Sequence, residues 1–177
     1  HVPNASLYAA YRALRQAGEG EGLRLFGARA VESMRLEKSF LHWKADLLTE
    51  FDPFEAGLER FVRMNKASDF VGKAAWAVRK ASGPRRCLVT LKIDSETAPA
   101  RPGASLMCAG RVVGTVTSGA WGHRLALNLA LAYVEPSLAD PRATIALDHC
   151  GAHVGAEVIA AAPYDPEMAR VRGGGSC

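Results

Sequence analysis

The chain has 177 residues, of which 49% are hydrophobic and 23% charged, and its formal net charge is +4. This composition is ordinary for a globular protein, and the length allows one domain or two small ones. Lysine and arginine occur singly or in short pairs, so we expect no nucleic-acid partner.

The sequence contains no uninterrupted apolar stretch near the roughly 18 residues needed to cross a bilayer, so we expect no membrane partner. No secretory signal is visible at the start. The four cysteines have no CxxC spacing. Reduced thiols and a cytoplasmic location are therefore expected.

The first half of the chain carries mainly helical signals. Leu7, Tyr11 and Leu14 recur at spacings of four and three, which predicts an amphipathic helix over residues 6–17 that Gly18 ends. Further elements are expected in this order: a helix over 28–36, a short helix from Asp52-Pro53 to Gly57, a strand over 61–64 and a helix over 68–80.

From residue 86 onward the pattern becomes strand-like. Strands are expected over 87–93, on both sides of an Ala109-Gly110 turn within 106–117, over 127–134, and over 144–147 paired with 156–159. Short strands separated by regular turns are typical of an antiparallel sandwich or barrel. We place a domain boundary near Gly83-Pro84, which divides residues 1–83 from 84–168 and leaves a flexible tail over 169–177.

Two further sequence patterns could indicate a metal site or a phosphate-binding loop. His149, Cys150 and His153 offer zinc-type ligands, but they share one hairpin loop without a fourth ligand nearby, so no metal site is predicted. The glycine-rich stretch 114–119 lacks the lysine of a P-loop, and strand bulging explains it better. No G-x-S-x-G elbow occurs, and we assign no catalytic residue within the chain.

The segment 34–47 mixes charges and aromatics in a way that fits neither a regular helix nor a regular strand. Phe40 and Trp43 are three residues apart, and in a turn both rings could face one cavity in which a flat heterocycle would stack. The alternative is that they are core aromatics that cover the neighbouring helices. Composition alone leaves both interpretations open.

Several motifs, in order along nearly the whole chain, resemble the aminomethyltransferase family of the glycine-cleavage T protein. They are Ser-Met-Arg-Leu-Glu-Lys at 33–38, His42-Trp43, Pro-Phe-Glu-Ala-Gly-Leu at 53–58, the stretch 111–119, and Pro163-Tyr164-Asp165-Pro166. More narrowly, the chain is similar to the folate-binding C-terminal part of sarcosine and dimethylglycine dehydrogenases.

The resemblance implies an α+β fold in which a partial α/β folate-binding domain over 1–83 precedes a small antiparallel β-barrel or jelly-roll-like domain. It implies tetrahydrofolate as cofactor, with Phe40, Trp43 and Glu37 as the cofactor-binding residues. Some family positions differ here: Val31 replaces a folate-binding arginine, Phe40 lacks the hydroxyl of the more usual tyrosine, and Ala169 replaces a tyrosine.

The family's catalytic aspartate would lie upstream of Val2-Pro3, so the resemblance implies that a missing N-terminal half of the same protein is the partner of this chain. The remaining partner would be a small-molecule N-methyl amine or aminomethyl donor. The resemblance also leaves room for FAD in a domain preceding this chain.

The leading hypothesis is tetrahydrofolate-dependent one-carbon transfer, as the C-terminal part of a sarcosine/dimethylglycine dehydrogenase-like enzyme. The alternatives are a stand-alone aminomethyltransferase, a folate-dependent demethylase, or a non-catalytic folate-fold module.

Overall fold

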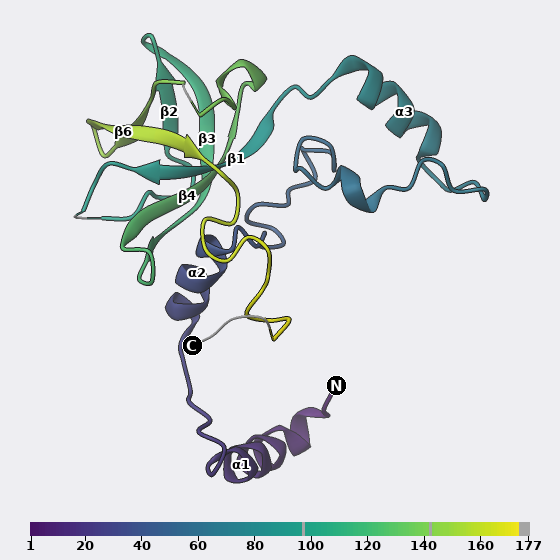
Figure 1. Ribbon diagram of the computed structural model, residues 1–177, viewed down its shortest axis with the longest axis vertical. Coiled ribbons are helices and arrows are strands. Elements are labelled where there is room, and N and C mark those ends of the chain that lie inside the picture. Colours follow the sequence, from purple (N-terminus) through teal and green to yellow (C-terminus); the bar gives the residue numbers. More distant parts are fainter. Residues whose placement is uncertain (97, 142, 174–177) are drawn as a thin grey trace. The chain divides into compact units, whose positions relative to one another are not determined.

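The computed structural model describes residues 1–96, 98–141 and 143–173 (Figure 1). The chain forms two compact units, residues 1–31 and residues 32–177. No helix among the described residues is long and apolar enough to cross a membrane. Of the predicted tail, residues 169–173 form turns and residues 174–177 lie outside the described residues. The domain boundary near Gly83-Pro84 stays a prediction.

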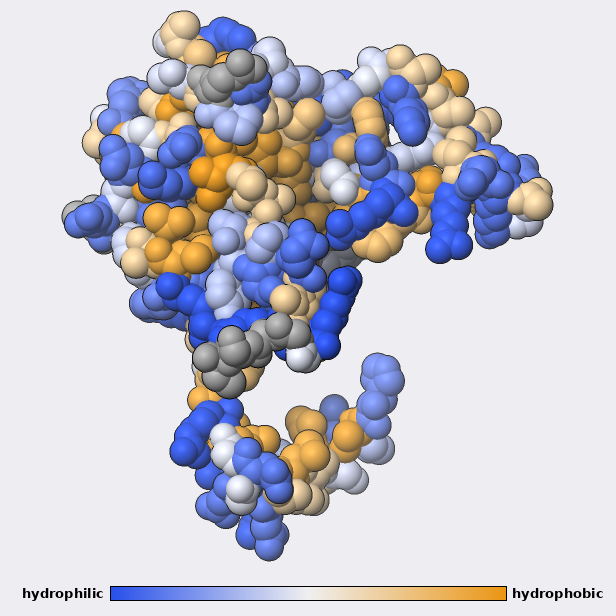
Figure 2. Space-filling view, in the orientation of Figure 1, coloured by the Kyte–Doolittle hydropathy of each residue, from blue (hydrophilic) through white to orange (hydrophobic). Residues whose placement is uncertain are grey.

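The first unit contains helix α1, Leu7–Gly18, which confirms the helix predicted over 6–17. None of its residues is buried, and the side chains of Leu7 and Leu14 are 59% and 70% exposed. Figure 2 shows these apolar surfaces as orange patches on the helix. A helix of this length is marginal by itself in water and is normally stabilised by packing of its apolar face. The apolar face of α1 therefore has the character of a contact surface.

Helices α2, Ala28–Glu37, and α3, Lys73–Ser82, confirm two more predicted helices, although α3 begins five residues later than predicted. The short helix predicted from Asp52-Pro53 to Gly57 is wrong, because residues 53–57 form only turns. Gly57, with φ +68°, ends this segment at the predicted position. The strand predicted over 61–64 is also wrong. A 3₁₀ helix, Glu59–Phe61, occupies its start, and no described strand pairs with it.

The second unit is built on six antiparallel strands, which close into a barrel (Figure 1). The strands are β1 Cys87–Ile93, β2 Ser105–Cys108, β3 Arg111–Gly122, β4 Leu127–Val134, β5 Ile145–His149 and β6 Ala152–Ile159. Their order around the barrel is β1-β4-β3-β2-β5-β6, and β6 pairs with β1 to close it. The predicted α+β class and the predicted barrel are both confirmed.

Two tight hairpins set the strand register. The predicted Ala109-Gly110 turn is confirmed, whereas β5 and β6 extend further toward their turn than the strands predicted over 144–147 and 156–159. Ala109 and Gly110 connect β2 to β3 with φ of 49° and 78°, and Cys150 and Gly151 connect β5 to β6 with φ of 56° and 86°. Positive φ at both central residues is what a type I′ hairpin turn requires.

Among the described residues no group of His, Cys, Asp or Glu side chains could hold a metal ion.

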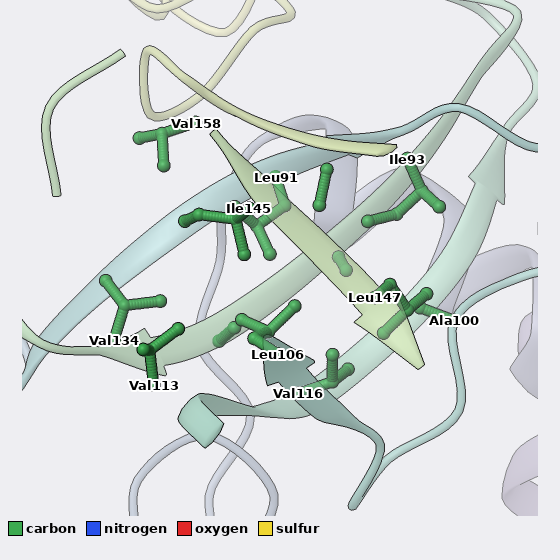
Figure 3. Close-up of a cluster of buried hydrophobic side chains, with 13 residues drawn as sticks. Leu91, Ile93, Ala100, Leu106, Val113, Val116, Val134, Ile145, Leu147 and Val158 are labelled. Carbon is green, nitrogen blue, oxygen red and sulfur yellow. The ribbon is translucent and has the colours of Figure 1, made fainter. Parts of the chain in front are cut away.

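The barrel interior is filled by aliphatic side chains from all six strands (Figure 3). The labelled members are Leu91, Ile93, Ala100, Leu106, Val113, Val116, Val134, Ile145, Leu147 and Val158. Strand β4 is also buried on its outer face, where Leu129 and Leu131 pack against Leu36 of α2. The end of α2 and the loop after it are thereby held against the barrel wall.

Candidate functional site

The loop that follows α2 carries the predicted aromatic pair. We call residues 40–47 the aromatic loop. The side chains of Phe40 and Trp43 are 50% and 64% exposed, so neither is a core residue in this structure. The interpretation as core aromatics is therefore wrong for the described chain. A bridge between Trp43 and Leu47 and the bond from Phe40 N–H to Arg35 C=O, 2.8 Å, give the loop a defined backbone.

Arg35 anchors this loop from inside. Its Nη1 lies 2.6 Å from Asp46 Oδ2 and 3.2 Å from the Phe40 carbonyl, and its Nη2 lies 2.7 Å from Ser118 Oγ. Both Nη2 and Nε also donate to Glu32, at 2.6 and 2.9 Å. A guanidinium offers five N–H donors, and these contacts engage all of them. Arg35 therefore positions the loop and has no donor left for a ligand.

Asp46 is the acceptor at the centre of the network, and its side chain is fully buried. Oδ1 accepts from the Thr117 and Ser118 hydroxyls at 2.6 and 2.7 Å, and Oδ2 accepts from His42 N–H at 2.9 Å as well as from Arg35. The two hydroxyls face the same way because the β3 register shifts between Val116 and Ser118. This confirms the bulge predicted in the glycine-rich stretch 114–119. Its effect is to aim two adjacent hydroxyls at one carboxylate.

Tyr133 on β4 completes the support. Its hydroxyl donates to the Asp46 carbonyl at 3.0 Å, and its ring stacks on Phe51 with centroids 3.6 Å apart. Burial, reinforced by the charge of Asp46 and then those of Glu55 and Asp52, raises the pKa of Tyr133 to about 12. A phenol with that pKa stays protonated near neutral pH, so Tyr133 acts as a fixed hydrogen-bond donor.

A cleft of about 840 Å³ opens between the polypeptide around residues 42–51 and strand β3. Its walls are largely apolar, with Leu48, Phe51 and Val116 among them, and Lys44 and Arg86 contribute positive charge. The volume is in the range of small-molecule sites. Phe40, Trp43 and Glu37 are not among its lining residues. The structure thus separates the predicted aromatic pair from this cleft.

Glu37 lies at the end of α2 and is only 4% exposed. Its Oε1 accepts from the backbone N–H groups of Arg124 and Leu125, at 2.7 and 3.0 Å. A Cβ on Gly122 would stand 3.0 Å from this carboxylate, which explains the glycine. The predicted cofactor ligand is therefore occupied by protein amides, whereas Phe40 and Trp43 are open to solvent.

A second buried carboxylate lies below the cleft. Asp52 Oδ1 accepts from Glu55 N–H at 2.9 Å, and Glu55 Oε2 accepts from Asp52 N–H at 3.1 Å, the reciprocal arrangement of a capping box. Burial by itself would raise the pKa of Glu55. Hydrogen bonds from Arg85 and from backbone amides outweigh burial and lower it. Glu55 is therefore an ionised structural anchor.

Two family models match the chain. A model described as GCVT N-terminal domain matches residues 1–66, and one described as glycine cleavage T-protein C-terminal barrel domain matches residues 86–165. A crystal structure of the glycine cleavage system aminomethyltransferase T from Bartonella henselae superposes with a TM-score of 0.82 at 26% identity. That match covers 89% of this chain and 45% of the other.

Curated relatives of two kinds are similar to this chain. Human mitochondrial dimethylglycine dehydrogenase is 36% identical over 85% of the chain and 17% of that protein, and mouse mitochondrial sarcosine dehydrogenase is 33% identical over 98% and 20%. An aminomethyltransferase of Streptomyces coelicolor is 40% identical over 85% of the chain and 41% of that protein. The chain thus spans less than half the length of these relatives.

Proposed function

Because the chain belongs to the glycine-cleavage T-protein family, we propose that it serves tetrahydrofolate-dependent one-carbon transfer. In this proposal it forms the C-terminal part of a sarcosine/dimethylglycine dehydrogenase-like enzyme. Dimethylglycine and sarcosine dehydrogenases are among the similar proteins, over 85% and 98% of the chain, which is compatible with this version. The substrate in this proposal is a small N-methyl amine or an aminomethyl donor.

The observation that carries the proposal is the anchored aromatic loop. Exposed large aromatics normally cost solubility, and they are found where a ligand or another protein surface covers them. Here Phe40 and Trp43 stand on a loop whose backbone is fixed from within by Arg35 and Asp46. A fixed pair of exposed rings suits the stacking of a flat pterin, because little conformational freedom is lost on binding.

Tetrahydrofolate, when bound, supplies the amines that take up the one-carbon unit. The residues of this chain would bind and orient it, with Phe40 and Trp43 as stacking surfaces and Arg35 and Asp46 as the residues that position them. The buried carboxylates Asp46 and Glu55 are saturated by donors, and neither is a free general base. The acid–base groups of the reaction are therefore expected on other parts of the enzyme.

The first unit offers the surface on which such a part would dock. The apolar face of α1 is bare, and the N-terminal family model is matched along residues 1–66. The remainder of that α/β domain is the occupant we propose, since this chain covers only 41% and 45% of two similar proteins. FAD belongs to the proposal only through a further domain outside this chain.

The test is titration of tetrahydrofolate by calorimetry into the complete protein that carries this chain and into its Trp43→Ala and Phe40→Ala variants. An aromatic pair contributes about 0.5–1.5 kcal/mol beyond area burial, so each variant should bind roughly two- to tenfold more weakly. The matched control is Phe61→Ala, since Phe61 is 68% exposed and lies outside the aromatic loop. Equal affinity in all four proteins would refute the stacking role of this loop.

The alternative functions differ in whether the complete protein contains a flavin and whether it binds folate. A stand-alone aminomethyltransferase or folate-dependent demethylase would bind the folate without flavin absorbance. A non-catalytic module would bind no folate even when the complete protein is used. The human and mouse dehydrogenases are named mitochondrial. Fractionation of cells that express this protein would test the cytoplasmic location that we propose for it.

A further inference from the structure

A second charged cluster lies near the C-terminal end of α2, around the ring of Tyr164. The Arg124 guanidinium carbon lies 5.0 Å from the ring centroid, and Lys38 Nζ lies 5.7 Å from it. Arg170 Nη1 donates to the Tyr164 hydroxyl at 2.6 Å. Three cations from three separate segments thus contact one aromatic side chain.

Only one of these cations has an acidic partner in the described part of the chain. Lys38 Nζ lies 3.0 Å from Asp165 Oδ2, and both side chains are mostly buried. Neither Arg124 nor Arg170 lies within 4.0 Å of a carboxylate of any described residue, and both are exposed. Two neighbouring guanidinium groups without an acid repel each other, and a bound anion would relieve that repulsion.

The backbone that carries the cluster is held in place by Glu37. The Glu37 carboxylate accepts from Arg124 N–H at 2.7 Å, and the Glu37 carbonyl accepts from Tyr164 N–H at 2.9 Å. The next residues continue the attachment, since Ser39 Oγ accepts from Ala162 N–H at 2.8 Å. One short segment, 37–39, therefore positions both the β3–β4 turn and the chain after β6. Phe40 follows that segment directly.

We infer that Arg124 and Arg170 form a carboxylate-binding site for the glutamyl tail of the folate, beside the aromatic loop. This rests on the proposed function. A folate joins a flat ring system to a glutamate with two free carboxylates, and the chain presents an exposed aromatic pair and two unpaired guanidinium groups on adjoining segments. Arginine suits this task because its planar fork can donate two parallel hydrogen bonds to one carboxylate.

In this assignment Glu37 is a positioning residue and does not itself bind the cofactor. It fixes Arg124 through the turn amides and Tyr164 through its carbonyl. Tyr164 and Lys38 are the supporting side chains, and Lys38 is neutralised by Asp165. The free positive charge is then concentrated on the two arginines.

The experiment compares two ligands, tetrahydrofolate with one glutamate and tetrahydropteroate, which lacks it. Each is titrated into the complete protein with the unaltered chain, and into its Arg124→Ala, Arg170→Ala and double variants. We expect each single change to weaken tetrahydrofolate about fivefold and to leave tetrahydropteroate unaffected, since exposed ion pairs contribute modestly. The double variant should bind the two ligands equally.

The matched control is Arg60→Ala. Arg60 is also exposed and lies 4.8 Å from the centroid of an aromatic ring, that of Phe61, but it lies outside the cluster. It should leave both affinities unchanged. Unaltered tetrahydropteroate binding in the Arg124 and Arg170 variants would also show that the aromatic loop is still folded.

The outcomes separate the two proposals. If the unaltered chain binds both ligands equally well, the carboxylate site is refuted and folate binding stands. If the arginine variants weaken both ligands alike, the arginines have a structural role only, and the site is again refuted. If the complete protein binds neither ligand, the proposed function fails and the carboxylate site fails with it.

Discussion

Removal of the Asp46 carboxylate should be among the most costly single changes in the second unit. The Asp46→Ala variant leaves Arg35 Nη1, the His42 N–H and two hydroxyls without their common acceptor. Loss of one partner from a buried ion pair costs about 3–5 kcal/mol, because the other charge stays buried and unpaired. In a chain of this length each kcal/mol lowers Tm by about 2–4 °C, so we expect a fall of roughly 10 °C.

The Asp46→Asn variant should be less stable than the unaltered chain but more stable than Asp46→Ala. An amide can present its oxygen to Arg35 and the His42 N–H and turn its nitrogen toward the Thr117 and Ser118 hydroxyls. These hydroxyls then accept a hydrogen bond where they donated one to the carboxylate, and the charge is lost. A cost of about 1–2 kcal/mol is expected. The free energy of unfolding is measured by urea titration with tryptophan fluorescence.

Glu32→Gln is the matched control for this series. Glu32 contacts the same guanidinium at 2.6 Å, but its side chain is 41% exposed. Exposed pairs contribute about 0–1 kcal/mol, so its removal should be nearly silent. An Asp46→Ala variant no less stable than Glu32→Gln would refute the argument that burial makes Asp46 the centre of the network.

Three further changes test other parts of the second unit. The lowered pKa of Glu55 contributes stability that is present above its ordinary pKa of 4.5 and is lost as the pH falls through the folded pKa. In Glu55→Gln the urea midpoint should therefore fall less steeply as the pH is lowered. A Cβ at Gly119 would meet the Ala100 carbonyl oxygen at 2.1 Å, so Gly119→Ala should destabilise the barrel by about 1–3 kcal/mol in the same urea assay. Because Tyr133 has a pKa of about 12, it should be the last tyrosine to ionise when phenolate absorbance is followed with rising pH. Tyr133→Phe should remove the absorbance increase at the highest pH, and removal of an increase at lower pH would contradict the burial argument.

The barrel was largely readable from the sequence. The bounds predicted for β1 and β4 match the structure, and the β2–β3 hairpin turns at Ala109-Gly110 as predicted. A strand with alternating or β-branched residues, and a type I′ turn that follows it, are each determined by residues within a few positions in the sequence. The helix predicted from Asp52-Pro53 to Gly57 is wrong although Gly57 ends the segment as predicted, because so short a segment makes too few hydrogen bonds to form a regular helix.

The candidate site was predicted only in part. The aromatic pair was found, because two large rings in a polar loop form a recognisable pattern. Arg35 and Ser118 were not expected to meet, since 83 positions separate them in the sequence. A signal did exist in the adjacent hydroxyls of Thr117 and Ser118 inside the predicted bulge, but only the fold shows which carboxylate they face.

The sequence by itself determined the strands, the hairpin turns, the amphipathic helix α1 and the aromatic loop, because each depends on neighbours close in the chain. The tertiary structure decided which polar groups remain free to bind. Glu37 looks like a ligand in the sequence, yet two amides from the β3–β4 turn occupy its carboxylate. Arg124 looks like an ordinary surface charge, yet it shares the ring of Tyr164 with two other cations. Each polar group can make only a few hydrogen bonds, and partners distant in sequence decide which of those bonds are already made.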